Sequence, residues 1–329
     1  MRILVTGGGG FLGSAICGQL RAQGHEVIAY QRRKATHLIA LGVYNICGDL
    51  GNLEQLNRDL RGCDAVIHTA GKAGVWGNYK DYYQANVLGT ENVISACRAN
   101  GIRSLVFTSS PSVVHGGGDI EGGDESLPYP RRFASPYPAS KALAEQLITA
   151  ANGDHLKTVS LRPHLIWGPG DPHLLPRLMA KAASGSLSLP GGGKLIDTIY
   201  VENAAQAHLL ALEAIQKGGP ACGKTYFVSN DEPLPQAEII SSLLRAAGME
   251  PQIKTIPPWV AKTAGTILQT TWKILRLKSE PPVTKWSAEQ LSTAHWYDIS
   301  AAKRDLNYHP DISIQQGLQK LTEFYSSNL

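Results

Sequence analysis

The stretch RILVTGGGGFLG, residues 2–13, decides the fold of this chain. Its first five residues form a mostly apolar run of strand length, and the residues that follow place apolar side chains at helical spacing. Between them, Gly7, Gly10 and Gly13 allow a tight turn and let backbone amides approach an anion at the positive end of the helix. A merely flexible turn is the alternative, but the position between strand and helix predicts a site for the pyrophosphate of a dinucleotide.

The same alternation continues along the first half of the chain. Short apolar runs at 25–30, 65–69 and 105–109 are separated by helical stretches, among them 34–41 and 82–100. Repeated strand–helix units predict an α/β fold, a doubly wound parallel sheet of the Rossmann type, whose ligands bind at the carboxyl ends of the strands. Beyond residue 230 helices joined by proline-rich turns predict a smaller, mostly helical C-terminal lobe that faces the substrate.

We expect the chain to divide into two units. Residues 1–167 form the dinucleotide-binding Rossmann domain, with a returning contribution from about 195–229. Residues 168–194 and 230–329 form the substrate-binding lobe.

Composition excludes several classes of protein. With 43% hydrophobic and 18% charged residues among 329, the chain can bury a sizeable core, and a net charge of +4 without a dense Lys/Arg tract argues against nucleic-acid binding. Five scattered cysteines, never spaced as CxxC, indicate neither a disulfide framework nor a metal site. The sequence shows no secretory signal and no long apolar run, so we expect a cytoplasmic protein without a membrane-spanning helix.

The residues at the end of the second expected strand bear on the choice of cofactor. NAD enzymes commonly place a carboxylate there to bind the ribose hydroxyls, but this chain has Tyr30-Gln31-Arg32-Arg33. Guanidinium groups suit a ribose 2′-phosphate, so we expect NADP(H); a solvated basic turn is the alternative, and Gln31 can still accept NAD. Asp49 follows the third strand, where it can bind the adenine amino group or cap a helix.

Two YxxxK matches occur, Tyr30 to Lys34 and Tyr137 to Lys141, and their context separates them. Tyr137 precedes Pro138 at the start of a helix-forming run, so Tyr137 and Lys141 lie one turn apart on one face. A neighbouring ammonium lowers the pKa of a phenol, which prepares Tyr137 to exchange a proton with a carbonyl or alcohol oxygen.

The run Thr108-Ser109-Ser110 ends another expected strand and offers a hydroxyl that can orient the same oxygen. Capping of the strand end is the alternative role for any one of these side chains.

Several charged and aromatic side chains are candidates for contact with the substrate. His68, His115 and His164 can meet an acidic substrate, although histidines at strand ends are more often structural. Lys72, Arg131 and Arg132 can bind a carboxylate or remain solvated, and Trp76 can line an apolar pocket or fill the core.

Together these motifs resemble the extended short-chain dehydrogenase/reductases. The resemblance covers nearly the whole chain and rests on the glycine motif, Asn86-Val87-x-Gly89-Thr90, Thr108-Ser109-Ser110, Tyr137-x-x-x-Lys141, and Arg162-Pro163 through Gly168-Pro169-Gly170-Asp171. Within that superfamily, Ala73-Gly74-Val75-Trp76-Gly77, Pro130-Arg131-Arg132 before Pro136-Tyr137, and residues 259–277 resemble the 3β-hydroxysteroid dehydrogenase branch.

The resemblance implies roles for the residues that carry it. Tyr137 is the general acid, Lys141 anchors the ribose, Ser110 holds the substrate oxygen and Asn86 completes a proton relay. The residues expected to bind the cofactor are Gly7, Gly10, Phe11, Leu12, Gly13, Gln31, Arg32, Arg33, Asp49, Leu50, Thr69, Ala70, Lys72, Tyr137, Lys141 and Pro163. The residues expected to contact the substrate are Trp76, Ser112, His115, His164 and Arg131. Because Pro111-Ser112 directly follows the serine run, Ser109 or Ser112 can take the place of Ser110.

The resemblance also implies the reaction. Hydride passes from NADPH to the 3-oxo carbon of a hydrophobic 2-alkyl-3-oxo acid, as in long-chain olefin biosynthesis. An NAD(P)-dependent 3β-hydroxysterol or sterol-4-carboxylate 3-dehydrogenase is the first alternative. A nucleotide-sugar epimerase and a non-catalytic NADP-binding regulator are weaker ones.

Residues 259–278 repeat apolar side chains at helical spacing, with Lys262, Lys273 and Arg276 on the opposite side. We expect an amphipathic helix that covers the substrate pocket, or that docks on a membrane surface or a partner enzyme in a multi-enzyme assembly. A homodimer is a further arrangement that the sequence allows.

Overall fold

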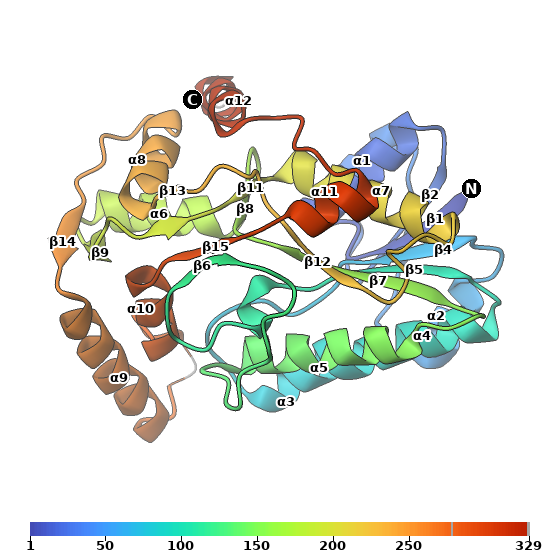
Figure 1. The fold of residues 1–329 in the computed structure, drawn as a ribbon, viewed down its shortest axis with the longest axis horizontal. Helices are drawn as coiled ribbons and strands as arrows, with labels where there is room; N and C mark the ends of the chain where they lie inside the picture. The colour runs from blue at the N-terminus through green and yellow to red at the C-terminus, as the bar shows by residue number, and fades with distance from the viewer. Residues whose placement is uncertain (278, 328–329) are drawn as a thin grey trace.

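The computed structural model describes residues 1–277 and 279–327. A seven-stranded parallel sheet lies at its centre, in the order β12-β7-β5-β4-β1-β2-β3 (Figure 1). Its strands are β1 (Arg2–Thr6), β2 (Glu26–Gln31), β3 (Tyr44–Cys47), β4 (Ala65–His68), β5 (Ser104–Thr108), β7 (Lys157–Pro163) and β12 (Thr225–Val228). The predicted doubly wound parallel sheet is therefore confirmed.

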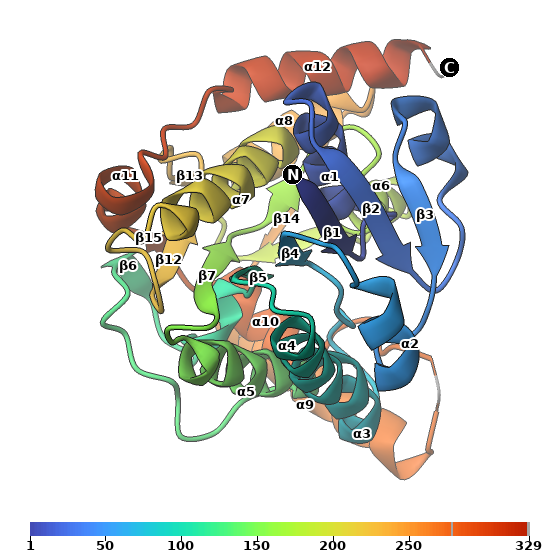
Figure 2. The ribbon, with the colours of Figure 1, turned by 90° about the vertical axis from the view of Figure 1, so that its right-hand side faces the viewer.

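Helices cover both faces of this sheet (Figure 2). One face carries α1 (Phe11–Ala22), α7 (Val201–Gln216) and α11 (Ser300–Leu306), and the other carries α2 (Leu53–Asp59), α4 (Gly89–Ala99) and α5 (Pro136–Ala151). In α1 the buried residues Leu12, Ile16 and Leu20 recur at helical spacing. The central strands are apolar along almost their whole length because both of their faces are buried.

The helix expected at 82–100 is not a single α-helix. It consists of α3 (Tyr79–Tyr82), a π-helical segment, η2 (Tyr83–Leu88), and then α4. The stretch expected as a helix at 34–41 is a 3₁₀-helix, η1 (Thr36–Leu41). π-helical turns are rare and occur frequently at functional sites, and this one contains Asn86.

The second lobe contains more strand than the sequence predicts. Its largest sheet has the order β13-β10-β15-β6, formed by β6 (Ile120–Gly123), β10 (Leu195–Ile196), β13 (Leu234–Pro235) and β15 (His295–Tyr297). Two further strand pairs join β8 (Ile166–Trp167) to β11 (Ile199–Tyr200) and β9 (Ser188–Pro190) to β14 (Lys254–Ile256). The helices of the lobe are α6 (Leu174–Ala183), α8 (Gln236–Ala246), α9 (Pro258–Ile274), α10 (Lys285–Ser292) and α12 (Ile314–Ser327).

Two strands of this four-stranded sheet cross the division expected from the sequence. β6 comes from within residues 1–167 and β10 from within 195–229, yet both belong to the sheet of the lobe. In the other direction, α11 packs on α7 and β12 of the central domain. The division into 1–167 with 195–229, and 168–194 with 230–329, therefore stays a prediction about folding units.

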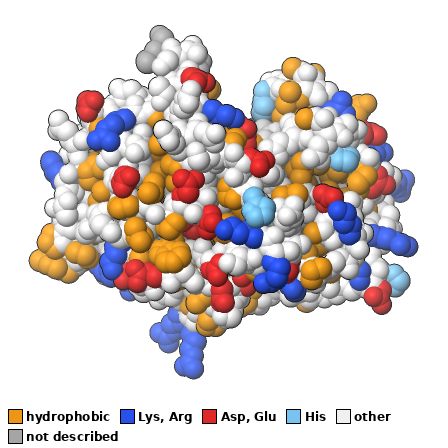
Figure 3. All heavy atoms as spheres, turned by 45° about the horizontal axis from the view of Figure 1, so that its top comes forward, with side chains coloured by type: hydrophobic (Ala, Val, Ile, Leu, Met, Phe, Trp, Pro, Cys, Tyr) orange, Lys and Arg blue, Asp and Glu red, His pale blue; other side chains and the backbone are white. Residues whose placement is uncertain are grey.

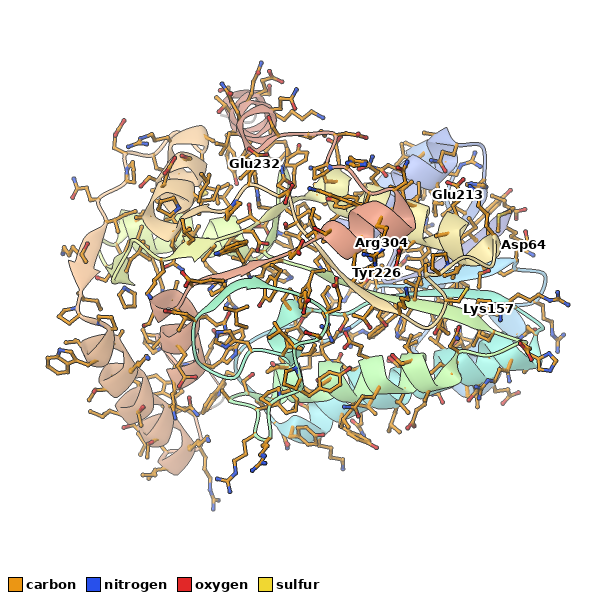
Figure 4. All side chains as sticks on the ribbon, in the orientation of Figure 1. Asp64, Lys157, Glu213, Tyr226, Glu232 and Arg304 are labelled. Atoms are coloured by element: carbon orange, nitrogen blue, oxygen red, sulfur yellow. The ribbon has the colours of Figure 1, made fainter. Side chains whose placement is uncertain are left out.

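The C-terminal segment is tied back to the central domain by polar contacts. The Tyr226 hydroxyl on β12 donates to Asp305 Oδ2 at 2.8 Å, and Figure 4 shows Tyr226 directly below Arg304 of α11. Glu232 lies below α12 in the same view and accepts a hydrogen bond from the Ile314 amide at 3.0 Å. These contacts hold α11 and α12 against the rest of the chain.

Among the described residues, no helix has the length and apolar character needed to cross a membrane. Acidic and basic side chains are interspersed over the face that carries α12, without a field of one sign (Figure 3). This pattern agrees with the small net charge of +4.

Candidate active site

Two glycines of the turn between β1 and α1, Gly7 and Gly13, leave no room for a side chain. A Cβ on Gly13 would lie 2.1 Å from the Gly7 carbonyl oxygen, and a Cβ on Gly7, whose φ is +69°, would lie 2.9 Å from the Ala70 backbone. Helix α1 begins at Phe11 without a side-chain cap. Its first amides are therefore directed at the turn, as the pyrophosphate of a dinucleotide requires.

The end of β2 presents cations and no carboxylate. Gln31 Oε1 accepts a hydrogen bond from the Gly9 amide at 3.1 Å, and Gln31 Nε2 donates to Asn45 at 3.0 Å, so this side chain supports the glycine turn. Arg32 and Arg33 are exposed. They can reach a phosphate on the ribose that lies over this strand.

Asp49 forms a local turn after β3. Its Oδ1 accepts from the Gly51 amide at 2.7 Å, while the cap of α2 is Asn52, which accepts from Gln55. The alternative role of Asp49 as a helix cap is therefore wrong. Leu50 is half-buried and packs on the core beside it.

The ends of β1 and β4 are held together by hydroxyl groups. Thr69 donates to the Thr6 carbonyl at 2.7 Å, and the Ala70 amide donates to the Thr6 hydroxyl at 3.2 Å. That hydroxyl lies 2.6 Å from His68 Nδ1, and His68 Nε2 lies 3.0 Å from Thr90 Oγ1. Both ring nitrogens of His68 are thus engaged inside the protein, and its role is structural.

Tyr137 stands at the start of α5, where Ser135 accepts from its amide at 3.3 Å and Pro136 occupies the first turn. The Ser110 side chain lies close enough to the Tyr137 hydroxyl to lower its pKa. Ser112 Oγ lies 2.9 Å from Ser110 Oγ, whereas Ser109 Oγ is buried without a hydrogen-bond partner among the described residues. Of the three candidate serines, Ser110 is the one that meets Tyr137.

Lys141 lies one turn below Tyr137 and points at the carboxyl end of β5. Its Nζ donates to the Thr108 carbonyl at 2.5 Å and lies 4.0 Å from the centroid of the Phe107 ring. Burial lowers the pKa of Lys141 to about 7, although Glu145 opposes the shift. The Thr108 hydroxyl is engaged on the other side of the sheet by His208 at 2.8 Å.

The expected lowering of the Tyr137 pKa by Lys141 is not seen. Burial raises the pKa of Tyr137, and Ser110 lowers it by less. The Lys141 amine donates to the Thr108 carbonyl, and its own pKa of about 7 leaves it uncharged in the pH range where a phenol titrates.

Asn86 connects three segments around the site. Its Oδ1 accepts from the Lys72 amide at 2.6 Å, and its Nδ2 donates to the Lys72 carbonyl at 3.1 Å and to Ser140 Oγ at 2.9 Å. The Asn86 carbonyl accepts from Thr90 at 2.6 Å. The side chain therefore ties the loop after β4 to α5, and its role in a proton relay stays a prediction.

The remaining predicted residues fall into two groups. Pro163 ends β7, and Ser112, His115 and His164 gather beyond the ends of β5 and β7. The second group lies nearer the surface. Trp76 is half-buried, and its carbonyl accepts a hydrogen bond from the Tyr82 hydroxyl at 3.0 Å. Lys72 pairs with Asp81 at 3.4 Å, and Arg131 and Arg132 are exposed.

Two polar residues of the lobe were not predicted from the sequence. Asp197 is 1% exposed and bound to His164, and His295 is 3% exposed and lies beside the same ring. The available signal was a carboxylate inside the apolar run 195–201 and an imidazole inside 294–297, since a buried polar group requires a partner. Within the described residues no group of three or more His, Cys, Asp or Glu can hold a metal ion.

A glycine cradle on a parallel sheet, with Ser110, Tyr137 and Lys141 at its carboxyl edge, defines an NAD(P)-binding oxidoreductase of the extended short-chain type. The chain belongs to the 3-beta hydroxysteroid dehydrogenase/isomerase family, whose profile matches residues 4–257.

Relatives of this chain are oxidoreductases. It is 50% identical to the 2-alkyl-3-oxoalkanoate reductase of Stenotrophomonas maltophilia, covering 98% of each chain. It is 47% identical to the protein of the same name from Shewanella oneidensis, covering 96% of this chain and 84% of that one. The human sterol-4-alpha-carboxylate 3-dehydrogenase, decarboxylating, is 31% identical over 98% of this chain and 88% of its own. The predicted enzyme class, oxidoreductases acting on hydroxy or oxo groups, is confirmed.

Solved structures share the fold. The UDP-glucose 4-epimerase of Thermus thermophilus in complex with NAD is 26% identical, with a TM-score of 0.76 over 100% of both chains. The Thermotoga maritima UDP-glucose 4-epimerase has a TM-score of 0.79 at 20% identity, over 100% of this chain and 99% of that one. The likeness to the Thermus thermophilus structure, which contains NAD, supports an NAD(P) cofactor.

The pKa of Lys141 makes stability depend on pH. Between pH 7 and 10.5 the folded protein holds this amine neutral while the unfolded chain binds the proton, so the free energy of unfolding rises with pH. In urea denaturation of the cofactor-free protein, Lys141→Met should remove a rise of up to about 1.4 kcal/mol per pH unit. The exposed Lys217→Met variant is the control and keeps the slope; an unchanged slope in Lys141→Met would contradict the assignment.

Proposed function

We propose that this protein uses NADPH to reduce the 3-oxo group of a hydrophobic 2-alkyl-3-oxo acid to the 3-hydroxy acid, a step of long-chain olefin biosynthesis. The observation that carries the proposal is the proximity of Ser110 to the Tyr137 hydroxyl, on the helix that also carries the buried Lys141. Two relatives at 50% and 47% identity whose names specify this substrate class support it.

The glycine turn would hold NADPH, which would supply the hydride for reduction at C3 of the substrate. Tyr137 would donate a proton to the oxygen of the reduced carbonyl, and Ser110 would hold that oxygen by a hydrogen bond. Because burial raises the pKa of Tyr137, the phenol keeps its proton at neutral pH, as a general acid must. Lys141, at the carboxyl end of β5, would hold the ribose hydroxyls, and Asn86 fixes the loop after β4.

Replacing Tyr137 with phenylalanine removes the hydroxyl that carries the transferable proton and keeps the aromatic ring. We expect turnover of a long-chain 2-alkyl-3-oxo acid to fall by a factor of about a hundred to ten thousand, with the NADPH dissociation constant nearly unchanged. NADPH oxidation is followed at 340 nm, with sterol ketones, sterol carboxylates and UDP-sugars as competing substrates. Turnover within a few-fold of wild type, or activity with UDP-sugars alone, would contradict the proposal.

We infer a preference for NADPH over NADH from the end of β2. No carboxylate stands there, Gln31 is occupied with the Gly9 amide, and Arg32 and Arg33 are exposed beside it. A guanidinium group forms paired charge-assisted hydrogen bonds with a phosphate.

Arg32→Glu should therefore flatten or reverse the ratio of the NADPH and NADH dissociation constants. Fluorescence titration of both cofactors measures this ratio, and Arg33→Glu tests the neighbouring side chain. The inference fails if the unmodified protein binds NADH more tightly than NADPH.

We further propose that α9 binds an anionic membrane surface, so that a cytoplasmic enzyme meets its lipid-like substrate there. One side of α9 packs on the lobe: a Cβ on Gly265 would lie 2.7 Å from the Thr284 carbonyl oxygen. On the other side Trp259, Ile267, Ile274 and Leu275 are 70%, 60%, 74% and 60% exposed. Ile267 and Leu275 thus lie outward, and the last residue of the predicted segment, Lys278, lies outside the described residues.

The charge of this segment favours a lipid surface over a second copy of the chain or a partner enzyme as the occupant of α9. Lys262, Lys273 and Arg276 accompany the exposed apolar side chains, and residues 251–279 contain no Asp or Glu. Apolar burial and attraction to anionic headgroups act together on such a helix.

Ile267→Ser with Ile274→Ser should weaken sedimentation with vesicles of phosphatidylglycerol and phosphatidylcholine at least about tenfold, because apolar area is lost. Ile39→Ser, at a site 50% exposed on η1, is the matched control and keeps binding. Wild type that stays in the supernatant would refute lipid binding. Dimers or capture by a partner enzyme that the double variant abolishes would show that protein covers α9 instead.

A further inference from the structure

Gln31 is the last residue of β2 and stands where NAD enzymes commonly place a carboxylate for the ribose hydroxyls. Its side chain is uncharged, but its carboxamide oxygen can accept a hydrogen bond from the 2′-hydroxyl of NADH. NADPH carries a phosphate in place of that hydroxyl and offers no such donor. The contacts of the Gln31 side chain therefore bear on the choice between the two cofactors.

Both ends of the Gln31 carboxamide are engaged inside the protein. Oε1 accepts from the Gly9 amide at 3.1 Å, and Nε2 donates to Asn45 Oδ1 at 3.0 Å. A Cβ on Gly9 would lie 3.4 Å from Gln31 Cδ, so the side chain packs directly on the glycine turn. While both hydrogen bonds hold, the carboxamide cannot rotate toward a ribose.

Asn45, on the edge strand β3, decides which way this carboxamide faces. Asn45 Oδ1 also accepts from the Ala35 amide at 3.1 Å, and Asn45 Nδ2 donates to the Val43 carbonyl at 3.2 Å. Because a backbone amide can only donate and a carbonyl can only accept, these two contacts fix the orientation of the Asn45 side chain. Its oxygen then requires a donor from Gln31, which directs Nε2 to Asn45 and Oε1 to Gly9.

The same Asn45 oxygen holds both ends of the short segment that carries the cations. Gln31 and Ala35 flank residues 32–34, which are two arginines and a lysine, all exposed. A Cβ on Gly9 would lie 2.7 Å from Ala35 Cβ, so both flanking residues contact the glycine turn. The side chains between them attract a phosphate and cannot accept a hydrogen bond from a hydroxyl.

Building on the proposed preference for NADPH, we propose that Asn45 is a positioning residue for cofactor selectivity: it holds the Gln31 carboxamide on the glycine turn and withholds its oxygen from the 2′-hydroxyl of NADH. With Asn45 in place, rotation of Gln31 toward the ribose exchanges two hydrogen bonds for one; without Asn45 it exchanges one for one. Arg32 and Arg33 thus favour NADPH by attraction, whereas Asn45 disfavours NADH by removing an acceptor.

The test measures the dissociation constants of NADH and NADPH by fluorescence titration. Asn45→Leu frees the Gln31 carboxamide and should lower the ratio of the NADH to the NADPH dissociation constant by about three- to tenfold, the size of one neutral hydrogen bond. Asn100→Leu is the matched control, because Asn100 donates to the Asn57 and Ala96 carbonyls at 3.1 and 2.9 Å instead. It should leave the ratio within about twofold of wild type.

A second variant shows whether Asn45 acts through Gln31. Gln31→Met should leave the ratio within about twofold of wild type, because the held oxygen does not serve NADH, and adding Asn45→Leu to it should produce no further change. A ratio that Gln31→Met raises threefold or more would mean that Gln31 already binds the ribose of NADH, which overturns the proposal. An Asn45→Leu effect that persists in the double variant also overturns it, since Asn45 then acts on the cations.

The remaining outcomes separate this proposal from the preference for NADPH. Equal weakening of both cofactors by Asn45→Leu, with the ratio unchanged, shows a merely structural role and overturns the proposal while the preference stands. Wild type that binds NADH more tightly overturns the preference, whereas the shift caused by Asn45→Leu still decides on Asn45. If Asn45→Leu does not fold, as judged by thermal unfolding, Gln31→Met alone decides.

Discussion

The buried ion pair between Arg162 and Glu145 is the constraint on which the site depends. Arg162 Nε and Nη2 donate to the two oxygens of Glu145 at 3.0 and 2.6 Å, and both side chains are at most 4% exposed. Tyr129 adds a hydrogen bond to the same carboxylate at 2.7 Å, and the Phe227 ring lies 5.0 Å from the guanidinium group. Loss of one partner of such a pair costs about 3–5 kcal/mol, because the other is left charged in a poorly solvated place.

This ion pair holds α5 against β7, and the positions of the candidate site residues on both elements depend on that contact. Glu145 lies one turn beyond Lys141 on α5, and Arg162 lies two residues before His164 on β7. Tyr137, the proposed proton donor at the start of α5, and His164, directly after β7, are thereby held by the same contact. Glu145 also opposes the shift that burial imposes on Lys141, whose pKa falls to about 7.

Uncharged side chains play the same supporting role on the side of the site where we expect the cofactor. Thr6, His68 and Thr90 form a continuous series of contacts from β1 through β4 to the carbonyl of Asn86. Burial lowers the pKa of His68 to about 3, so this series contributes no charge at neutral pH. A neutral support leaves Lys141 and the cations at the end of β2 to interact with the anionic cofactor without a competing field.

The sequence alone determined those features that depend only on interactions between residues close together in the chain. The glycine spacing from Gly7 to Gly13 requires only one turn, and the four-residue spacing of Tyr137 and Lys141 requires only one helix. The turn that opens α1 and the placement of Tyr137 and Lys141 one turn apart on α5 were therefore predictable.

Tertiary structure decided everything that depends on burial or on contacts between distant segments. Which of Ser109, Ser110 and Ser112 lies beside Tyr137 depends on how the end of β5 meets α5, and Asn86 of the π-helical turn meets Lys72 and Ser140 only in the folded chain. His164 and Asp197 are 33 residues apart and meet only because β10 joins the sheet of the lobe. The directions of the pKa shifts likewise come from desolvation and partner charges, which arise when the chain packs and are absent from any local pattern.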